Sequence, residues 1–533
     1  MKVLLINPPL PERTYPGKAM GIDYLAKVLG DNNHNVDILD LDAPDSRELK
    51  VLLEKFKPCI VGLTNLSIQN DLANEIAHKV KTFDRSILVV KGGTHEIFGF
   101  PTTLTYNKEY IDYVVVGEGE KSFPALVNAY AFGDLEIRRK SIPGLAYCES
   151  GRIRYTGKTT FCSATELNEL IPKRLYHSSY YDFDIFNKRK TAQMMTSRGC
   201  ANSCNFCMES RMGHTERSRS LSSIYSEVYK LRNKGYEAIY FDDSTFTRDK
   251  NRVEKICELF REEFPDMIWA CNTRIDCLDE NLITCMERSG CVYMFTGFES
   301  AVPAVLVGLN KTHNPRAYLR NSELIYNKLA RSSIQSSVFL IFGAAKRTLA
   351  PLHKGKLEKK IYVSIDGEHH SRTFEPECFE DVKTSIDFAV YKLKPQYLSM
   401  NVLRLLPGSP FSEDECFSCI RPHGDIVHAG HYDKRWYQEH DKVDIRTRHH
   451  IYRAFEGRGS VVPPQMTPDY CYSILEYAVN AVNSNKSVNC RLVVDKAFED
   501  TYMEHRNGKY RLVPFREIAE NGSLEVEAVQ GAR

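Results

Sequence analysis

Three cysteines lie within eight residues in the middle of the chain, in the segment TSRGCANSCNFC. Cys200, Cys204 and Cys207 follow a C-x3-C-x2-C spacing, so one loop can bring three thiolates together. Structural zinc sites normally take ligands from two separated pairs, and no such pair flanks this triplet. Soft thiolates crowded into a short loop suit an iron–sulfur cluster. A cubane cluster held by three cysteines leaves one iron open to a small molecule, which predicts a catalytic centre.

This segment resembles the signature of the radical S-adenosylmethionine enzymes, in which an aromatic residue, here Phe206, precedes the third cysteine. Other segments resemble strand ends of that family, namely YFDDSTFT, CNTRIDCLDE, GFES and RLLPGSPF. The resemblance implies a 4Fe–4S cluster whose open iron chelates S-adenosylmethionine. One electron from the cluster would then cleave the sulfonium to a 5′-deoxyadenosyl radical, which implies an electron donor such as a flavodoxin or a ferredoxin.

The same resemblance predicts which residues contact S-adenosylmethionine: Phe206, Asp242, Arg274, Glu299 and Gly343. Glu299 either holds the ribose or the amino acid end of the cofactor, or forms an ion pair with Arg274. Asp242 and the next aspartate end one strand, so one faces the interior of the barrel and the other its wall. Gly343 lies near the adenine, or simply closes a turn at the end of its strand.

The first 150 residues alternate short apolar runs with helical periodicity, as in KVLLINPP, GIDYLAKVLGDNNH and NVDILDLD. This alternation predicts an α/β fold with a parallel, doubly wound, Rossmann-like sheet. Ligands of such sheets bind where the strands end at their carboxyl side. The corresponding loops, which include GLTNLS, KGGTHE and GEGEKS, are rich in small, hydroxyl and acidic residues, as a ligand crevice would be.

This N-terminal part resembles the cobalamin-binding domain of class B radical enzymes in INPP, IVGLTNLS, VVKGGTH and VVVGEGEKSF. The resemblance implies cobalamin as a further cofactor, bound by Thr64, Asn65, Leu66, Ser67, Gly92, Gly93, Thr94, Gly117, Glu118 and Gly119. Cobalamin domains of the methionine-synthase type carry a D-x-H-x-x-G motif whose histidine ligates cobalt, and this chain lacks that motif. We therefore expect no protein histidine on cobalt, with Leu66 or Asn65 facing the metal. The alternative is that this Rossmann-like domain binds no cobalamin and serves only as a structural platform.

A second strand–helix series covers residues 185–410 and predicts a partial (β/α)6 barrel of the triosephosphate-isomerase type, with the cysteine triplet just after its first strand. Residues 151–184 are interpreted as a connector and residues 411–533 as a small, mainly helical C-terminal domain. An insertion at 346–377 replaces the short G-x-P-x-E-T turn usual in the family. Its segment KIYVSIDGEHHSRTFE predicts a β-hairpin with Asp-Gly at the turn, and the insertion is either a substrate lid or an inert surface element.

Composition and charge indicate which partners and which compartment to expect. The formal net charge of +2 gives no electrostatic reason to expect nucleic acid or an anionic membrane as a partner. We see no apolar run long enough to span a bilayer and no signal peptide. Most of the sixteen cysteines stand singly in apolar segments, which favours a reducing cytoplasm. Cys416 and Cys419, close to His423, His428 and His431, leave a zinc site open.

The two halves together predict a cobalamin-dependent radical S-adenosylmethionine methyltransferase, which transfers a methyl group from methylcobalamin to an unactivated carbon of a small molecule or peptide. The alternative uses both cofactors for cyclisation or rearrangement without net methyl transfer. A methylthiotransferase would carry three more cluster cysteines in its N-terminal domain, where this chain has only Cys59 and Cys148 before residue 151. A non-catalytic corrinoid- or metal-binding protein would not need an open cluster iron.

Overall fold

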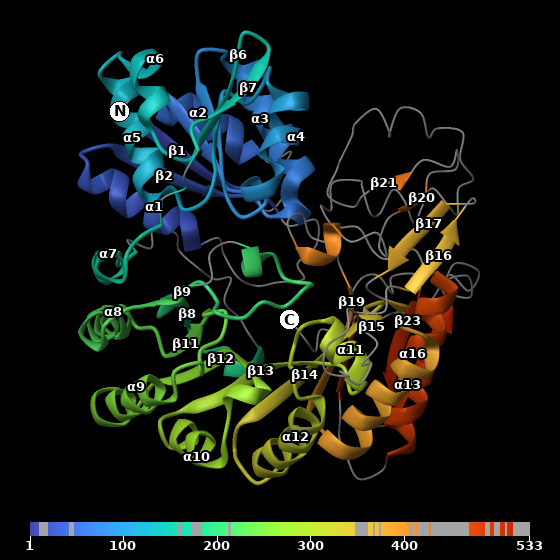
Figure 1. Ribbon diagram of the computed structural model, residues 1–533. Coiled ribbons are helices and arrows are strands. Elements are labelled where there is room, and N and C mark those ends of the chain that lie inside the picture. Colours follow the sequence, from blue (N-terminus) through green and yellow to red (C-terminus); the bar gives the residue numbers. More distant parts are fainter. Residues whose placement is uncertain are drawn as a thin grey trace, which may run out of the picture.

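The computed structural model describes residues 1–9, 20–41, 47–157, 159, 161–172, 184–211, 215–346, 375–403, 409–413 and 468–485, with short strands at 361–365, 368–372, 419–420, 426–427, 491–494, 501–506 and 509–514. Two α/β units make up most of this part of the chain, the first blue to cyan and the second green to orange in Figure 1. Each unit is built around one seven-stranded sheet. The predicted order, a Rossmann-like unit followed by a partial barrel, is confirmed.

The sheet of the first unit has the strand order β2-β1-β3-β4-β5-β6-β7, and β1 to β5 are parallel. Parallel strands covered on both faces need nearly continuous apolar runs, and β1 (Lys2–Asn7) buries four consecutive residues, Val3 to Ile6. Helices α2, α3 and α4 cover one face, and α1 and α5 cover the other. The remaining parallel strands are β2 Asn35–Asp40, β3 Ile60–Leu63, β4 Leu88–Lys91 and β5 Tyr113–Val115, and the helices are α1 Met20–Asp31, α2 Arg47–Phe56, α3 Asn70–Phe83, α4 Glu96–Asn107, α5 Gly119–Ala131 and α6 Leu135–Arg138.

The boundary predicted at residue 150 falls inside a β-hairpin. Strands β6 (Leu145–Glu149) and β7 (Arg152–Tyr155) pair antiparallel and extend the first sheet. The two residues between them, Ser150 and Gly151, both have positive φ, at 51° and 75°. Two consecutive positive φ values are typical of the tight turns that join hairpin strands. The sheet of the first unit therefore continues into the segment that the sequence assigned to a connector.

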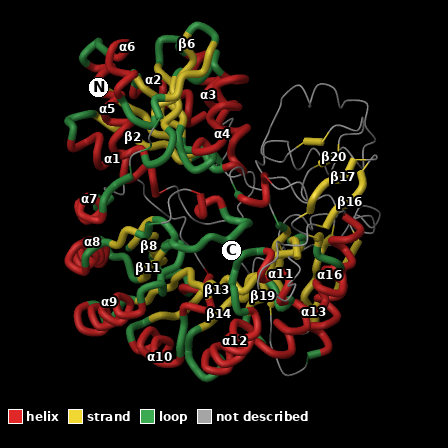
Figure 2. Tube along the Cα trace, in the orientation of Figure 1, coloured by secondary structure: helices red, strands yellow, loops and turns green. Residues whose placement is uncertain are grey.

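The second unit confirms the six predicted barrel strands. They lie in the order β19-β14-β13-β12-β11-β8, all parallel, with β22 added beyond β19. Figure 2 shows the helices in red along the outer side of this curved sheet. The strands are β8 Thr191–Met194, β11 Ala238–Phe241, β12 Ile268–Arg274, β13 Cys291–Glu299, β14 Gln335–Phe342 and β19 Tyr397–Val402, and the outer helices are α8 Leu221–Asn233, α9 Lys250–Glu263, α10 Glu280–Arg288, α12 Pro315–Leu329 and α13 Phe379–Asp387.

Side chains on the barrel strands alternate between two surroundings. Ile239 and Phe241 of β11 pack with helix residues in the outer core, while Ala238 and Tyr240 pack in a separate inner cluster. The inner cluster also contains Phe186, from the short helical turn η3 (Asp184–Phe186) that precedes β8. The start of the predicted barrel segment thus fills the interior of the barrel with Phe186 before the first strand begins.

Two elements of the predicted C-terminal domain, α16 and β22, belong to the barrel. Helix α16 (Pro468–Ser484) buries Ile474 and Leu475 in the outer core, and β22 (Arg491–Val494) pairs with β19. An amphipathic helix and a short apolar strand gain more burial on an existing sheet edge than in a small separate core. A further hairpin, β23 (Thr501–Arg506) with β24 (Lys509–Pro514), contacts α16.

The predicted hairpin within the insertion is confirmed. Strands β16 (Ile361–Ile365) and β17 (Glu368–Arg372) pair antiparallel across the two-residue Asp-Gly position. The two roles considered for the insertion, a substrate lid or an inert surface element, stay predictions. In the described part of the chain, no helix combines the length and apolar composition that crossing a membrane requires.

Candidate active site

The cysteine triplet lies in a loop that leaves the barrel after β8. The loop starts from β9 (Ser197–Arg198), and the chain after it returns through β10 (Arg217–Ser218), which pairs antiparallel with β9. The backbone N–H of Asn205 donates to Leu309 O at 2.9 Å, and its side-chain amide donates to Gly308 O at 2.7 Å. The loop is therefore fastened at both ends and at its middle, which holds the three thiols in place.

Two side chains donate directly to the thiols. Arg274 Nη1 lies 3.2 Å from Cys204 Sγ, and Asn202 Nδ2 lies 3.2 Å from Cys200 Sγ. Burial raises the pKa of Cys207 to about 12, and the charges of Glu209, Cys204 and Cys200 add to this effect. Burial also raises the pKa of Cys204, although the cations Lys311 and Arg274 oppose it. Cys204 is buried, and Cys200 and Cys207 are half-buried. Thiols become thiolates when they ligate a metal, so three cysteines on one loop fit an iron–sulfur cluster.

Glu299 forms its ion pair with Lys311 and not with Arg274, so the pairing expected as the alternative is wrong. Lys311 Nζ lies 2.9 Å from Glu299 Oε1, and both side chains are almost fully buried. Arg274 instead pairs with Asp276 at 2.7 Å and donates to Lys311 O at 2.6 Å. A Cβ at Gly297 would lie 2.5 Å from Glu299 Oε1 and 3.0 Å from Lys311 Nζ, so a larger residue there would require this ion pair to shift. Lys311 was missed because it follows the short helix α11 (Pro303–Gly308), outside the segments that resemble the family.

The structure settles which aspartate at the end of β11 faces inward. Asp243 is fully buried in the wall and accepts from the backbone N–H of Thr196 at 2.6 Å and from Ser197 Oγ at 2.9 Å. Asp242 is half-buried and accepts from Gln193 Nε2 and, at 3.4 Å, from Asn272 Nδ2. Asp242 is therefore the inward residue, as the predicted list of cofactor contacts requires, although its contact with S-adenosylmethionine stays a prediction.

Gly343 directly follows β14 and has a φ of +82°. Its N–H donates to Glu377 Oε2 at 2.9 Å, and the N–H of Ala344 donates to the same oxygen at 3.2 Å. Strands β15 (Ala345–Lys346) and β18 (Glu375–Pro376) pair and bring Glu377 back to the strand end after the insertion. Glu377 thus lies beside the end of β14 although it follows Gly343 by 34 residues. Burial raises the pKa of Glu377 to about 8, against the pull of these two N–H groups.

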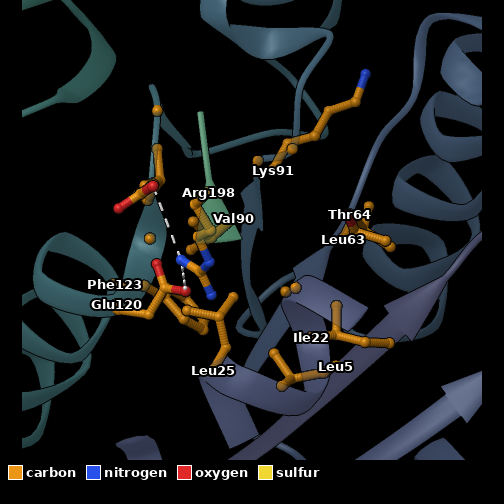
Figure 3. A pocket seen from close by; sticks show the side chains of 18 of the residues that line it. Leu5, Ile22, Leu25, Leu63, Thr64, Val90, Lys91, Glu120, Phe123 and Arg198 are labelled. Atoms are coloured by element: carbon orange, nitrogen blue, oxygen red, sulfur yellow. Dashed lines mark ion pairs between the residues drawn. The ribbon is translucent and has the colours of Figure 1, made fainter. Parts of the chain in front are cut away.

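A cavity of about 170 Å³ lies at the carboxyl ends of the first sheet. It is lined by six of the residues predicted to bind cobalamin: Thr64, Gly92, Gly93, Gly117, Glu118 and Gly119. Gly93 and Gly117 have φ values near +100°, and a Cβ on Gly117 would lie 1.9 Å from Thr159 Cγ2. Leu5, Ile22 and Phe123 form an apolar end of the cavity (Figure 3). Glycine backbone lets a ligand approach closely, and the apolar recess beside it suits a flat group such as the base of the nucleotide tail of cobalamin.

The other predicted cobalamin residues lie on the loops beside this cavity. Asn65 is fully buried and donates from Nδ2 to Glu96 Oε1 at 2.9 Å, and Ser67 Oγ lies 2.9 Å from His95 Nδ1. Leu66, in contrast, is 43% exposed. Of the two residues expected to face cobalt, only Leu66 thus presents its side chain at the loop surface. Thr94 is half-buried at the start of the next loop.

Ion pairs join the two units between the cavity of the first unit and the cysteine loop of the second. Arg217 donates to the carboxylate of Glu118 through Nη2 at 2.7 Å and Nη1 at 3.0 Å, and Arg198 Nη1 lies 2.7 Å from Glu120 Oε1 (Figure 3 marks the pairs of Arg198). Burial alone would raise the pKa of Glu118, but the hydrogen bonds from Arg217 and the charge of Arg198 outweigh it and lower that pKa. Arg198 lines the cavity and stands two residues before Cys200. Neither arginine had a signal in the sequence, because a single arginine outside a recognised motif does not indicate its partner.

The proposed zinc ligands lie outside the described residues. Cys416, His423, His428 and His431 belong to segments that the structure does not describe, and only the backbone of Cys419, in β20 (Cys419–Ile420), is described. The zinc site stays a prediction.

Comparison with known proteins follows the same division of the chain. Residues 10–127 match the B12 binding domain, and residues 194–344 match the Radical SAM superfamily. An uncharacterized methyltransferase, PH0819 from Pyrococcus horikoshii, is 30% identical over 330 residues, which cover 59% of this chain and 69% of that protein. Cytidylyl-2-hydroxyethylphosphonate methyltransferase from Streptomyces wedmorensis is 29% identical over 390 residues, covering 62% and 70%.

A solved structure has the same overall fold. The radical S-adenosylmethionine methyltransferase TsrM from Kitasatospora setae, determined with cobalamin and a 4Fe–4S cluster bound, superimposes with a TM-score of 0.68. The superposition covers 95% of this chain and 93% of TsrM at 17% identity. A second structure of TsrM holds its tryptophan substrate and an analogue of S-adenosylmethionine. At this identity the likeness shows the fold, in which a cobalamin unit and a radical S-adenosylmethionine unit occur together.

Proposed function

The chain belongs to the cobalamin-dependent radical S-adenosylmethionine methyltransferases, and from this premise we propose that it methylates an unactivated carbon of a small molecule or peptide side chain. When bound, the cluster and cobalamin supply the reductive cleavage of S-adenosylmethionine and the transferable methyl group. The observation that carries the proposal is the strand β9. Arg198 of this strand lines the cavity of the first unit, and Cys200 follows two residues later. One short segment therefore links the two proposed cofactor sites, which supports the proposal.

The protein's own residues would hold and orient the two cofactors. Cys200, Cys204 and Cys207 would ligate three irons and leave the fourth open. Arg274 donates to Cys204 Sγ, and a cationic donor stabilises a thiolate in a buried loop. Leu66, at the exposed loop tip, would cover the lower face of cobalamin without coordinating cobalt, which favours release of the methyl group.

Two further expectations concern partners and compartment. Cleavage of S-adenosylmethionine consumes one electron, so we infer a flavodoxin- or ferredoxin-type donor. We infer a reducing cytoplasm because the described cysteines, such as the buried Cys257, Cys271 and Cys291, are free thiols.

The test begins with anaerobic reconstitution using iron, sulfide and hydroxocobalamin, followed by iron and corrinoid quantification on the desalted protein. We expect about four irons and about one corrinoid per chain. Cys200→Ala should lose the iron, whereas the matched control Cys257→Ala, a buried thiol of the outer core, should retain it. Four irons without corrinoid would show that the first unit does not bind cobalamin, and this result would refute the methyltransferase proposal.

The mass of the product then distinguishes methyl transfer from cyclisation or rearrangement, the two reactions that this pair of cofactors could support. The reconstituted protein is supplied with S-adenosylmethionine, a reductant and a library of candidate acceptors. A product heavier by one CH2 unit, with 5′-deoxyadenosine as the second product, supports methyl transfer. A product of unchanged mass, or one that has only lost hydrogens, supports cyclisation or rearrangement instead.

A further inference from the structure

The cavity of the first unit is an unfilled part of an apolar core. Helices α1 and α5 cover one face of the sheet, and the core between them and the sheet contains Leu5, Ile22, Val90, Val115 and Phe123. All five side chains also line the cavity, and none of them is more than 4% exposed. A group that enters the cavity therefore contacts the apolar core of this unit and not its outer surface.

Two glycines help to leave this space open. Gly62 of β3 lies between two lining side chains, because a Cβ there would be 2.9 Å from Leu5 Cδ2 and 3.1 Å from Phe123 Cζ. Gly119, the first residue of α5, lies beside a third, and its Cβ would be 3.1 Å from Leu25 Cδ2. Neither glycine has a positive φ, so the close packing, and not the backbone conformation, calls for glycine at these positions. A larger residue at either position would force the apolar lining to shift.

The charged side chain of Lys91 points away from the cavity. Val90 packs in the core on the side of α1 and α5, and successive strand residues face opposite sides of a sheet, so Lys91 faces the other side. Its Nζ donates to Asn70 Oδ1 at 2.8 Å and to Asn74 Oδ1 at 2.6 Å, both on α3. Figure 3 shows this side chain extending away from the apolar end of the cavity. The amine is therefore not placed to contact a group inside it.

The other charged residues of the lining are already paired. Arg198 Nη1 lies 2.7 Å from Glu120 Oε1, and Arg217 Nη2 lies 2.7 Å from Glu118 Oε1. Among the described residues that line the cavity, Thr64 carries the one uncharged side chain with a hydroxyl or amide group. The lining thus combines apolar side chains with ion pairs whose charges cancel, and such a lining suits an apolar group.

The cavity is too small for a whole corrinoid. Its volume of about 170 Å³ is well below the roughly 300 Å³ at which pockets for drug-sized ligands begin, so it takes a bicyclic base and not a corrin ring with its amide side chains. Corrinoids share this ring and differ in the base of the nucleotide tail, which is dimethylbenzimidazole in cobalamin and a purine in other members of the class. The outer edge of dimethylbenzimidazole carries two methyl groups, whereas adenine carries an amino group and ring nitrogens there. Burying such polar atoms without hydrogen-bond partners is unfavourable.

We propose that this cavity selects the corrinoid by the base of its nucleotide tail, accepting dimethylbenzimidazole and rejecting purines, through apolar side chains such as Leu5, Val115 and Phe123. This selectivity rests on the proposed function and goes beyond it, because use of cobalamin does not by itself exclude other corrinoids. Apolar pockets distinguish ligands that differ by one small group by about 10–200-fold, which sets the size of the effect expected here.

Equilibrium dialysis of the full-length protein, with its cluster reconstituted but without corrinoid, tests this assignment. The probes are cobalamin, adeninylcobamide, which differs from it in the base, and cobinamide, which has no base. All three are reduced to the Co(I) state with titanium(III) citrate, so that cobalt holds no axial ligand and the base of the first two probes is free. We expect cobalamin to bind at least tenfold more tightly than either of the other two probes.

Two matched variants test whether the lining of the cavity causes the selectivity. Val115→Thr adds a hydroxyl to the lining with little change in volume, so it should reduce the preference for cobalamin over adeninylcobamide at least threefold. The control is Val114→Thr, because Val114 is also buried on β5 but packs in the core on the opposite face of the sheet. This control should keep the preference within twofold of wild type. Cobinamide affinity does not involve the base, so it should be unchanged in both variants and serves as the check on folding.

Three results would overturn this assignment alone. Equal affinity for cobalamin and adeninylcobamide would show that the cavity does not distinguish the bases, and equal affinity for cobalamin and cobinamide would show that it does not hold the base. An identical response of Val115→Thr and Val114→Thr would place the selectivity elsewhere. In each of these cases cobalamin still binds, so the proposed function stands. Failure of all three probes to bind would refute the proposed function together with this assignment.

Discussion

Replacing Lys311 with methionine should destabilise the barrel strongly. The change removes the cation that lies 2.9 Å from Glu299 Oε1, while both side chains are less than a tenth exposed. Breaking a buried ion pair by removing one partner typically costs about 3–5 kcal/mol, because the other charge is left buried without compensation. Methionine keeps a similar volume, so the cost should come from the charge and not from a cavity.

The double variant separates this charge effect from other damage. Glu299→Gln together with Lys311→Met leaves no unpaired charge, so it should recover most of the loss and be more stable than Lys311→Met alone. The matched control is Lys250→Met, which breaks the pair with Asp279 on the surface, where the two side chains are 41% and 46% exposed. An exposed pair of this kind is worth less than about 1 kcal/mol.

The assay is urea unfolding of the anaerobic apoprotein, followed by tryptophan fluorescence. Trp269 is fully buried in the outer core of the barrel and donates to Ser289 O at 2.9 Å, so its emission reports unfolding of that unit. The chain contains two tryptophans, and a Trp436→Phe background leaves Trp269 as the sole reporter. Should Lys311→Met prove no less stable than Lys250→Met, or should the double variant be the least stable of all, the reasoning from the buried pair would be refuted.

Three further predictions address the other parts of the site. Gly117→Ala should reduce bound corrinoid per chain at least fivefold and leave bound iron unchanged. An alanine there is strained at a φ of +100°, and its Cβ would clash with Thr159. An unchanged corrinoid content would exclude this loop from cobalamin binding. Arg198→Met should lower corrinoid retention on desalting by severalfold, whereas the exposed Arg154→Met should not, and equal retention in both would mean that the pair with Glu120 does not shape the cavity. Burial raises the pKa of Glu377 to about 8 from an ordinary 4.5, so the native protein holds a proton that the unfolded chain has released, and stability falls as pH rises from about 5 to 8. Glu377→Gln should remove this fall in urea midpoints measured across that range, and a slope identical to wild type would show that Glu377 is ionised throughout.

Much of the architecture follows from the sequence because it depends on neighbours along the chain. The alternation of apolar runs and amphipathic helices predicts both sheets, and the six barrel strands lie where the pattern places them. The hairpin with Asp-Gly at its turn is likewise a local property, confirmed by β16 and β17. The elements at 145–155 and 468–494 were assigned differently, because the sequence of a short strand or helix does not indicate which sheet edge it will join.

The cysteines predicted to ligate the cluster follow from the sequence alone, since a compact C-x3-C-x2-C motif puts three thiols on one loop whatever surrounds it. Partners that lie far apart along the chain were decided only by the tertiary structure. Glu299 pairs with Lys311, and Glu377 returns to the strand end of Gly343 across a long insertion. Which of two adjacent aspartates faces inward depends on the register of β11 in the folded sheet. The physical reason is the same in each case: a charged group takes the partner that folding places within a few ångströms, and distance along the sequence does not carry that information.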